Sequence, residues 1–205
     1  LLLGQAFYDY RIDDWWSAVE GFAMMGPNDY ININNGQRKR IAAFAEYESQ
    51  INTKLWLNSG IRVEHVKTRA DDVQPYNEGM AMMNMNAMPM QPNNANAAAA
   101  FNAIEHNKSD TVVDISVLLN YQLTPNDELQ LGLARKNRAP NLYERYSWGV
   151  SNMATTMIGW YGDGNGYIGN PNLAVETAHT VSSTYIKSAQ NDDWRGSANI
   201  WYTDT

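Results

Sequence analysis

The sequence predicts an all-β protein, namely part of an antiparallel transmembrane β-barrel with short periplasmic turns and long extracellular loops. Three observations support this prediction. The regular segments alternate apolar and polar residues with a period of two, the pattern of a strand with two different faces. Most run for about ten residues or more, enough to cross a membrane as tilted strands. The connections between them alternate between long and short, as in outer-membrane barrels.

Composition excludes several other classes of protein. The 205 residues contain no cysteine, which rules out disulfides, zinc fingers and thiol nucleophiles. The formal net charge of −7 argues against a nucleic-acid partner. No segment reaches the roughly 18 to 20 apolar residues of a membrane-spanning helix. If the chain crosses a membrane, it therefore crosses with strands.

Seven segments are expected to form strands, and the alternation is clearest between Thr111 and Leu123. There, alternate residues from Val113 to Leu123 form an unbroken apolar face, and Asp114 lies on the polar face opposite. The first segment opens with a run of leucines, which blurs its pattern. In chain order the predicted strands are 1–10, 41–50, 55–67, 111–123, 129–134, 181–187 and 194–202.

The connections between these segments fall into two length classes. Three are short and polar, which suits hairpin turns. The other three are several times longer, and soluble sheet proteins rarely alternate connections so regularly. A soluble antiparallel β protein nevertheless remains the alternative interpretation. The short connections are 50–54, 124–127 and 189–193, and the long ones are 12–36, 69–108 and 141–176.

Each face of the predicted sheet has its own expected environment. Aromatic residues near strand ends would form the girdles of a membrane barrel at the lipid–water interfaces. These residues are Tyr8, Tyr10, Tyr47, Trp56, Tyr121, Trp194 and Tyr202. Polar residues opposite the apolar stripes would line a hydrated lumen. These residues are Arg62, Glu64, Asp114, Asn120, Gln130 and Lys136.

The number of predicted strands indicates a piece of a larger barrel. Single-chain bacterial barrels have even strand counts from about 8 upward, whereas about seven strands are predicted here. Two open edges would leave unpaired backbone groups in lipid, at a cost of several kcal/mol each. The chain also begins with Leu rather than Met and shows no signal peptide. We therefore expect residues 1–205 to form part of one barrel domain.

All ten methionines lie in the three long connections, and none lies in a predicted strand. Thioether sulfur is a soft ligand that selects Cu(I), and it stays unprotonated in acid, so copper binding is the favoured interpretation. A soft hydrophobic contact surface, an oxidation-prone patch and simple low complexity are the alternatives. The candidate metal ligands are Met24, Met25, Met80, Met82, Met83, Met85, Met88, Met90, Met153, Met157 and His106.

An enzymatic function has little support in the sequence. No Ser/His/Asp arrangement or paired carboxylates stand out, and we expect no catalytic cofactor. Segment 164–169 matches the glycine spacing of dinucleotide-binding loops, but no strand precedes it and no apolar helix follows. A glycine-rich turn explains this segment better.

Two segments resemble motifs of the TonB-dependent outer-membrane receptors. Residues 138–146, RAPNLYERY, resemble the R-A-P-x-L-x-E-x-Y segment that ends a barrel strand in that family. Residues 169–173, GNPNL, resemble the start of its G-N-P-x-L-K-P-E motif, although the Lys and Pro are absent here. Within the family, the methionine-rich connection and the segment 148–169 are similar to copper receptors, as are 13–16 and 24–28.

The resemblance implies a barrel of about 22 strands in the outer membrane of a Gram-negative cell. A plug domain would fill the barrel and a TonB box would couple it to the inner membrane; we expect both outside these residues. The implied function is copper transport, with the methionine loops capturing the ion. The softness of thioether sulfur favours Cu(I) as the captured species. The implied partners are the copper ion, outer-membrane lipid, the plug domain and the TonB complex.

Two alternative functions remain open. The receptor could take up a siderophore-like organic metal chelate or another ligand, with the methionine loops as a contact surface. The chain could also belong to a soluble β-sheet binding protein.

Overall fold

The computed structural model describes residues 1–17, 29–74, 95–148, 167–191 and 193–205. These residues form one antiparallel sheet of seven strands, which pair in chain order, together with two short helices. Neither helix is long and apolar enough to cross a membrane. The elements are β1 (Leu2–Trp16), β2 (Tyr30–Asn52), β3 (Leu55–Arg69), α1 (Ala95–Asn102), β4 (Lys108–Thr124), β5 (Asp127–Arg138), α2 (Leu142–Tyr146), β6 (Glu176–Ser188) and β7 (Arg195–Asp204).

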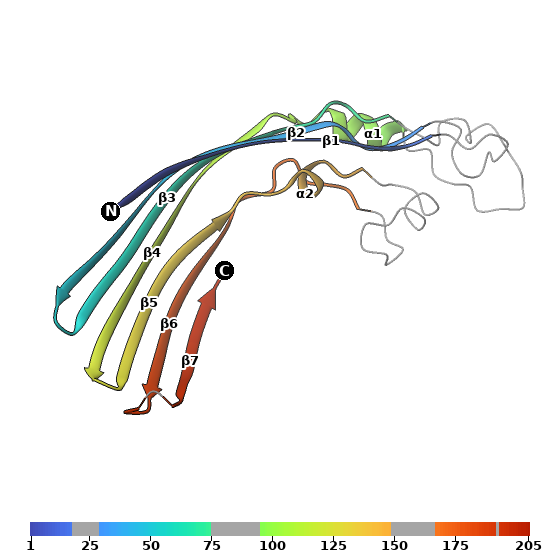
Figure 1. Ribbon diagram of the computed structural model, residues 1–205. Helices are drawn as coiled ribbons and strands as arrows, with labels where there is room; N and C mark the ends of the chain where they lie inside the picture. The colour runs from blue at the N-terminus through green and yellow to red at the C-terminus, as the bar shows by residue number, and fades with distance from the viewer. Residues whose placement is uncertain (18–28, 75–94, 149–166, 192) are drawn as a thin grey trace, which may run out of the picture.

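The sheet is strongly curved, and its connections are sorted between its two ends (Figure 1). The short turns β2–β3, β4–β5 and β6–β7 all lie at one end. The three longer connections leave from the opposite end, where both helices are found. The predicted alternation of long and short connections is therefore confirmed, as is the all-β antiparallel fold.

Several strands are longer than the sequence predicted. β2 begins at Tyr30 rather than at Ile41, and β1 continues to Trp16, so the first long connection is shorter than expected. The pairing of these extensions contains register shifts near Ile12 and Asp14. Asn35 also adopts a left-handed backbone with φ of 46°. An apolar–polar period appears only where one face is apolar, so residues 35–40, which are glycine or polar, give no strand signal. Ile31 and Ile33 do alternate with Asn32 and Asn34, and the prediction missed this short signal.

The register separates the two faces of the sheet as expected. Arg62 pairs with Asp114, and Asn120 pairs with Gln130, on the face that also carries Thr68. This is the concave face, because Thr68 contacts α2, which lies on the concave side of the sheet (Figure 1). Apolar pairs such as Ile61 with Ile115 fill the convex face. Apolar side chains there are largely uncovered by protein, for example Phe7 at 72% and Ile200 at 77% exposed. This exposed apolar face is the one that lipid would contact.

The predicted aromatic girdle is wrong for three of its members. Tyr8 pairs with Arg40, and Trp56 pairs with Asn120, which places both on the concave face. Tyr10 stacks with Tyr8 at a ring-centroid distance of 6.3 Å and shares that face. Because side chains alternate strictly along a strand, a position near a strand end does not determine which face a residue occupies. Three of the other members, Tyr47, Tyr121 and Tyr202, share register rows with convex-face residues.

Candidate functional site

The RAPNLYERY segment begins where two neighbouring strands separate. The ladder between β4 and β5 ends at the pair Ile115 and Arg135. Above it, the backbone N–H of Asn137 donates to Asp114 Oδ1 at 2.8 Å, and its side-chain amide donates to the Val113 carbonyl at 2.6 Å. Side-chain bonds thus replace the backbone ladder and leave the chain free to turn into α2.

Helix α2 is short, and its first turn is capped by Asn141, which precedes it, and by its own Glu144. Asn141 accepts a hydrogen bond from the Glu144 backbone N–H, and Glu144 accepts one from the Asn141 N–H, each at 2.8 Å. This reciprocal arrangement is a capping box. Arg138 then donates to both oxygens of Glu144 and to both oxygens of Glu176. The hydrogen bonds from Arg138 hold the pKa of Glu144 below its usual range.

Arg145 is the most deeply buried cation of the motif, at 2% exposed. One of its amino groups donates to Thr68 Oγ1 at 2.8 Å. The other donates to the Leu173 carbonyl at 3.1 Å and lies 2.9 Å from Asp110 Oδ2. One guanidinium therefore joins β3, β4 and the end of the third long connection.

Tyr146, the last residue of α2, is also buried, at 1% exposed. Its hydroxyl donates to the His106 carbonyl at 2.7 Å and lies 2.9 Å from Thr68 Oγ1. Since Arg145 donates to Thr68 and Tyr146 uses its proton on His106, the Thr68 hydroxyl is left to donate to Tyr146. Burial raises the pKa of Tyr146, so the phenol stays protonated for this bond.

The GNPNL segment packs directly against α2. The Gly169 N–H donates to the Ser147 carbonyl at 2.7 Å, and the Asn170 N–H donates to the Glu144 carbonyl at 2.9 Å. A Cβ on Gly169 would lie 2.4 Å from the carbonyl carbon of Arg145, too close for any other residue to fit unchanged. The two segments that resemble family motifs therefore form one interlocked unit.

A second cluster lies beside this unit and includes the start of the third long connection. Trp148, at 1% exposed, packs against Phe101 of α1 with ring centroids 5.4 Å apart. Val73 and Ala98 complete the cluster. The backbone N–H of Trp148 also donates to the Asn32 side-chain oxygen at 2.8 Å. Side chains or backbone from beside all three long connections thus meet here.

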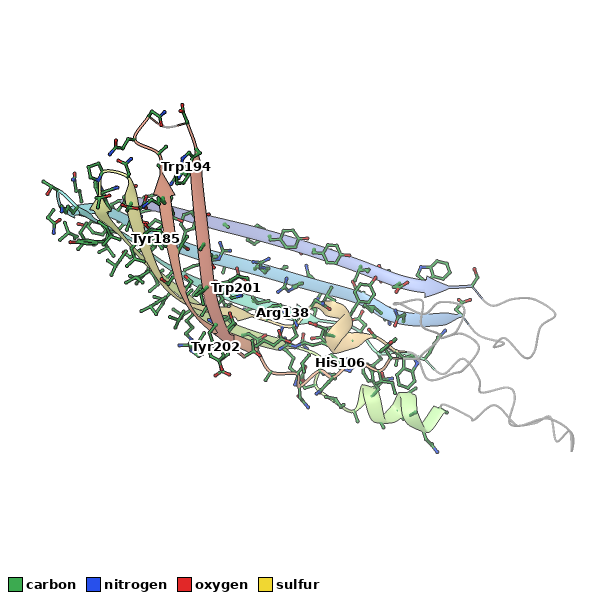
Figure 2. The ribbon with its side chains drawn as sticks, turned by 90° about the horizontal axis from the view of Figure 1, so that it is seen from below. His106, Arg138, Tyr185, Trp194, Trp201 and Tyr202 are labelled. Carbon is green, nitrogen blue, oxygen red and sulfur yellow. The ribbon has the colours of Figure 1, made fainter. Side chains whose placement is uncertain are left out.

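We call Asn32, Phe101, His106, Tyr146 and Trp148 the base cluster. Asn32 lies beside the first long connection, at the start of β2. Phe101 of α1 and His106 belong to the second connection, and Tyr146 and Trp148 lie near the start of the third. Figure 2 shows His106 and Arg138 at this end of the sheet, with Tyr185 and Trp194 toward the other. The base cluster therefore joins described residues that lie beside or within each of the three long connections.

The ten methionines predicted as copper ligands lie outside the described residues, and their place remains a prediction. His106 is described and is 6% exposed. Its ring packs against Phe101 at 4.9 Å and Tyr146 at 5.8 Å between centroids. Its Nε2 lies 3.1 Å from the Phe101 carbonyl oxygen. In this conformation His106 contacts protein through Nε2, and its role as a copper ligand remains untested.

The predicted polar lumen contains an ion network that the sequence alone did not reveal. Arg40 donates through Nε and an amino group to the two oxygens of Glu64, at 2.8 and 2.6 Å. Arg62 donates to the same carboxylate at 2.7 Å. The Glu64 side chain is only 9% exposed, and a buried charge is costly unless it is paired. The two guanidinium groups provide that pairing. The pairing of β2 with β3 brings Arg40 to Glu64 and Arg62, and the pattern of a single sequence cannot show that register.

Within the described ranges, no group of three or more His, Asp or Glu side chains is placed to hold a metal ion.

Comparison with known proteins identifies the family. The family model "TonB dependent receptor-like, beta-barrel" matches residues 1–205. The chain therefore belongs to the TonB-dependent receptor β-barrel family. A search of curated proteins gives no match. Among solved structures, a chain described as "Copper transporter OprC" matches with a TM-score of 0.51 and 13% identity, covering 92% of this chain and 25% of that chain. This likeness concerns the fold.

Proposed function

We propose that these residues are part of the barrel of an outer-membrane TonB-dependent receptor that imports copper, and that its methionine-bearing connections capture the ion as Cu(I). The chain spans about a quarter of the matched transporter, so the plug domain and the TonB box would be supplied by other parts of the receptor. The apolar convex face would contact lipid, and the charged concave face would contact the plug.

The location of the methionines is the observation that supports copper. All ten lie in connections that leave one end of the sheet, opposite the three short turns. The base cluster joins the described flanks of these connections through buried contacts, among them the bond from Trp148 to Asn32 and the contact of Trp148 with Phe101. A common base favours ligation by sulfurs from more than one connection. The matched structure is also described as a copper transporter.

A direct test replaces the six methionines of segment 80–90 by leucine in the complete receptor. We expect the purified variant to lose affinity for Cu(I) in competition with a chelator, because leucine keeps the volume but removes the sulfur. The matched control replaces Leu129, Leu131 and Leu133 by methionine, which adds sulfur on the lipid face and should leave copper affinity unchanged. Equal Cu(I) affinity in the leucine variant and the wild-type receptor would refute capture by this segment.

The second candidate function, uptake of an organic metal chelate, makes a different prediction. Cells that carry the leucine variant would then accumulate free copper normally while losing uptake of the chelate. Measuring both uptake rates in the same cells separates the two functions.

A further inference from the structure

The convex face changes character at the end of the sheet that carries the long connections. Along β2 the exposed apolar residue Ile41 is followed, two residues toward that end, by Lys39. Along β3, Val63 and His65 are followed by Lys67 and then Arg69 on the same face. Side chains two residues apart on a strand share a face. A band of cations therefore lies directly above the apolar band.

The strand register gathers these cations into one hollow. Lys39 pairs with Lys67, which pairs in turn with Ser109 of β4. Arg69 lies in the next register row, opposite Gln37. Lys39, Lys67, Arg69 and Ser109 all line the same surface hollow. Three cationic side chains and the Ser109 hydroxyl, all hydrogen-bond donors, therefore surround one exposed hollow.

The balance of charge in this hollow is positive, although the chain as a whole carries −7. Asp9 lies 4.0 Å from the Lys39 ammonium and partly compensates it. Within the part of the chain that the structure describes, neither Lys67 nor Arg69 forms an ion pair with a carboxylate. Lys108 also borders the hollow, but its ammonium donates to Asn172. Lys67 and Arg69 are therefore the cations available to an external anion.

We propose that this hollow binds the phosphorylated headgroup of a lipid in the outer leaflet of the membrane. A guanidinium and an ammonium are the side chains that proteins use to bind phosphate oxygens. Basic residues next to a membrane-spanning surface bind anionic headgroups in the same way. The proposal rests on the membrane placement of the barrel and not on copper transport.

A membrane lipid fits this site better than a free anion because the hollow adjoins exposed apolar surface. Ile41 is 59% exposed and Val63 is 43% exposed, one or two register rows below the cations on the same face. A lipid bound through its phosphate would lay its acyl chains on this surface and bury both partners' apolar groups. Inorganic phosphate would make only the polar contacts.

The test measures binding of bis-phosphorylated lipid A to the complete receptor in detergent, by native mass spectrometry. The variant is Lys67→Gln with Arg69→Gln, and we expect its affinity for lipid A to fall by about 30-fold. The matched control, Lys54→Gln with Arg195→Gln, removes the same charges near the short turns and should bind like the wild-type receptor. Dephosphorylated lipid A should bind weakly to all three proteins.

Three outcomes would overturn the proposal: undiminished lipid A binding by the hollow variant, an equal loss in the control, or displacement of lipid A by an equal concentration of inorganic phosphate. The last would indicate a site for the free anion. Gel migration of unheated samples checks that each barrel is folded. Cu(I) affinity should be unchanged in the hollow variant, so a failure of this proposal can be distinguished from a failure of copper capture.

Discussion

Gly169 lies against the backbone of Arg145, where a Cβ would come within 2.4 Å of the Arg145 carbonyl carbon and oxygen. The φ angle of Gly169 lies outside the left-handed region, so space rather than backbone conformation requires glycine here. Both residues lie within the third long connection, Arg145 near its start and Gly169 near its end. Their contact holds the two ends of that connection together.

Replacing Gly169 by alanine should destabilise the receptor. The added methyl group would meet backbone atoms, which cannot rotate away, and overpacking of this kind costs about 1–3 kcal/mol. The measurement is the urea midpoint of unfolding of the receptor in detergent. Gly196→Ala is the matched control, because its Cβ would meet only the Trp194 ring at 3.9 Å. An unchanged midpoint for Gly169→Ala would contradict the interlocked arrangement.

Removing the buried cation Arg145 should be more costly. Arg145→Leu would leave Asp110 without its partner at 2.9 Å, and breaking a buried pair costs about 3–5 kcal/mol. The double variant Arg145→Leu with Asp110→Leu should recover part of this loss because no unpaired charge remains. Arg195→Ala serves as control, since that residue is 4.0 Å from Glu128 and exposed, and should cost about 1 kcal/mol or less. Equal losses for the single and double variants would count against the ion pair.

Tyr146→Phe tests the hydroxyl that joins α2 to the second connection. The variant keeps the ring but leaves the His106 carbonyl and the Thr68 hydroxyl without their partner. Buried groups left unsatisfied cost about 1–3 kcal/mol. Tyr202→Phe, at a residue that is 70% exposed, should change stability little. Similar unfolding midpoints for the two variants would show that the buried hydroxyl contributes nothing.

The pH dependence of stability should include a contribution from Glu144. Its pKa in the folded receptor is lowered, first by the hydrogen bonds from Arg138. A group whose folded-state pKa is depressed contributes stability that is complete above its unfolded pKa of about 4.3. That stability is lost as the pH falls through the folded-state pKa.

The matching measurement compares the wild-type receptor with Glu144→Gln between pH 7 and acid. We expect the difference in unfolding free energy to be constant near neutrality and to shrink as the pH falls below about 4.3. Asp72→Asn, at an exposed position beside the second connection, is the control and should not reproduce this change. A difference that stays constant into acid would contradict the role of the Arg138–Glu144 pair.

The middle parts of the strands could be predicted because one face of the sheet is apolar and the other is polar, so successive residues alternate. Val113 to Leu123 shows this alternation within a single segment. The extension of β2 could be predicted only in part. Ile31 and Ile33 alternate with Asn32 and Asn34, which is a strand signal that the prediction missed. Residues 35–40 contain no apolar side chain, so they carry no such signal.

Some features of the candidate site could likewise be predicted from the sequence, and others could not. The positions of the methionines and the resemblance of segments 138–146 and 169–173 to family motifs are visible in the chain itself. The burial of His106 and the network around Glu64 depend on contacts between residues far apart in sequence. For the same reason, the cations Lys39, Lys67 and Arg69 appear scattered in the sequence and adjacent only in the sheet.

By itself, the sequence determined the all-β architecture, the two faces of the sheet and the grouping of every methionine into three connections, because each of these depends on local spacing. Only the tertiary structure decided that Arg145 pairs with Asp110, that Gly169 must be glycine and that the flanks of the three connections share one base. Those relationships require strand register and chain reversal to bring distant residues within contact, and no local pattern encodes such a distance.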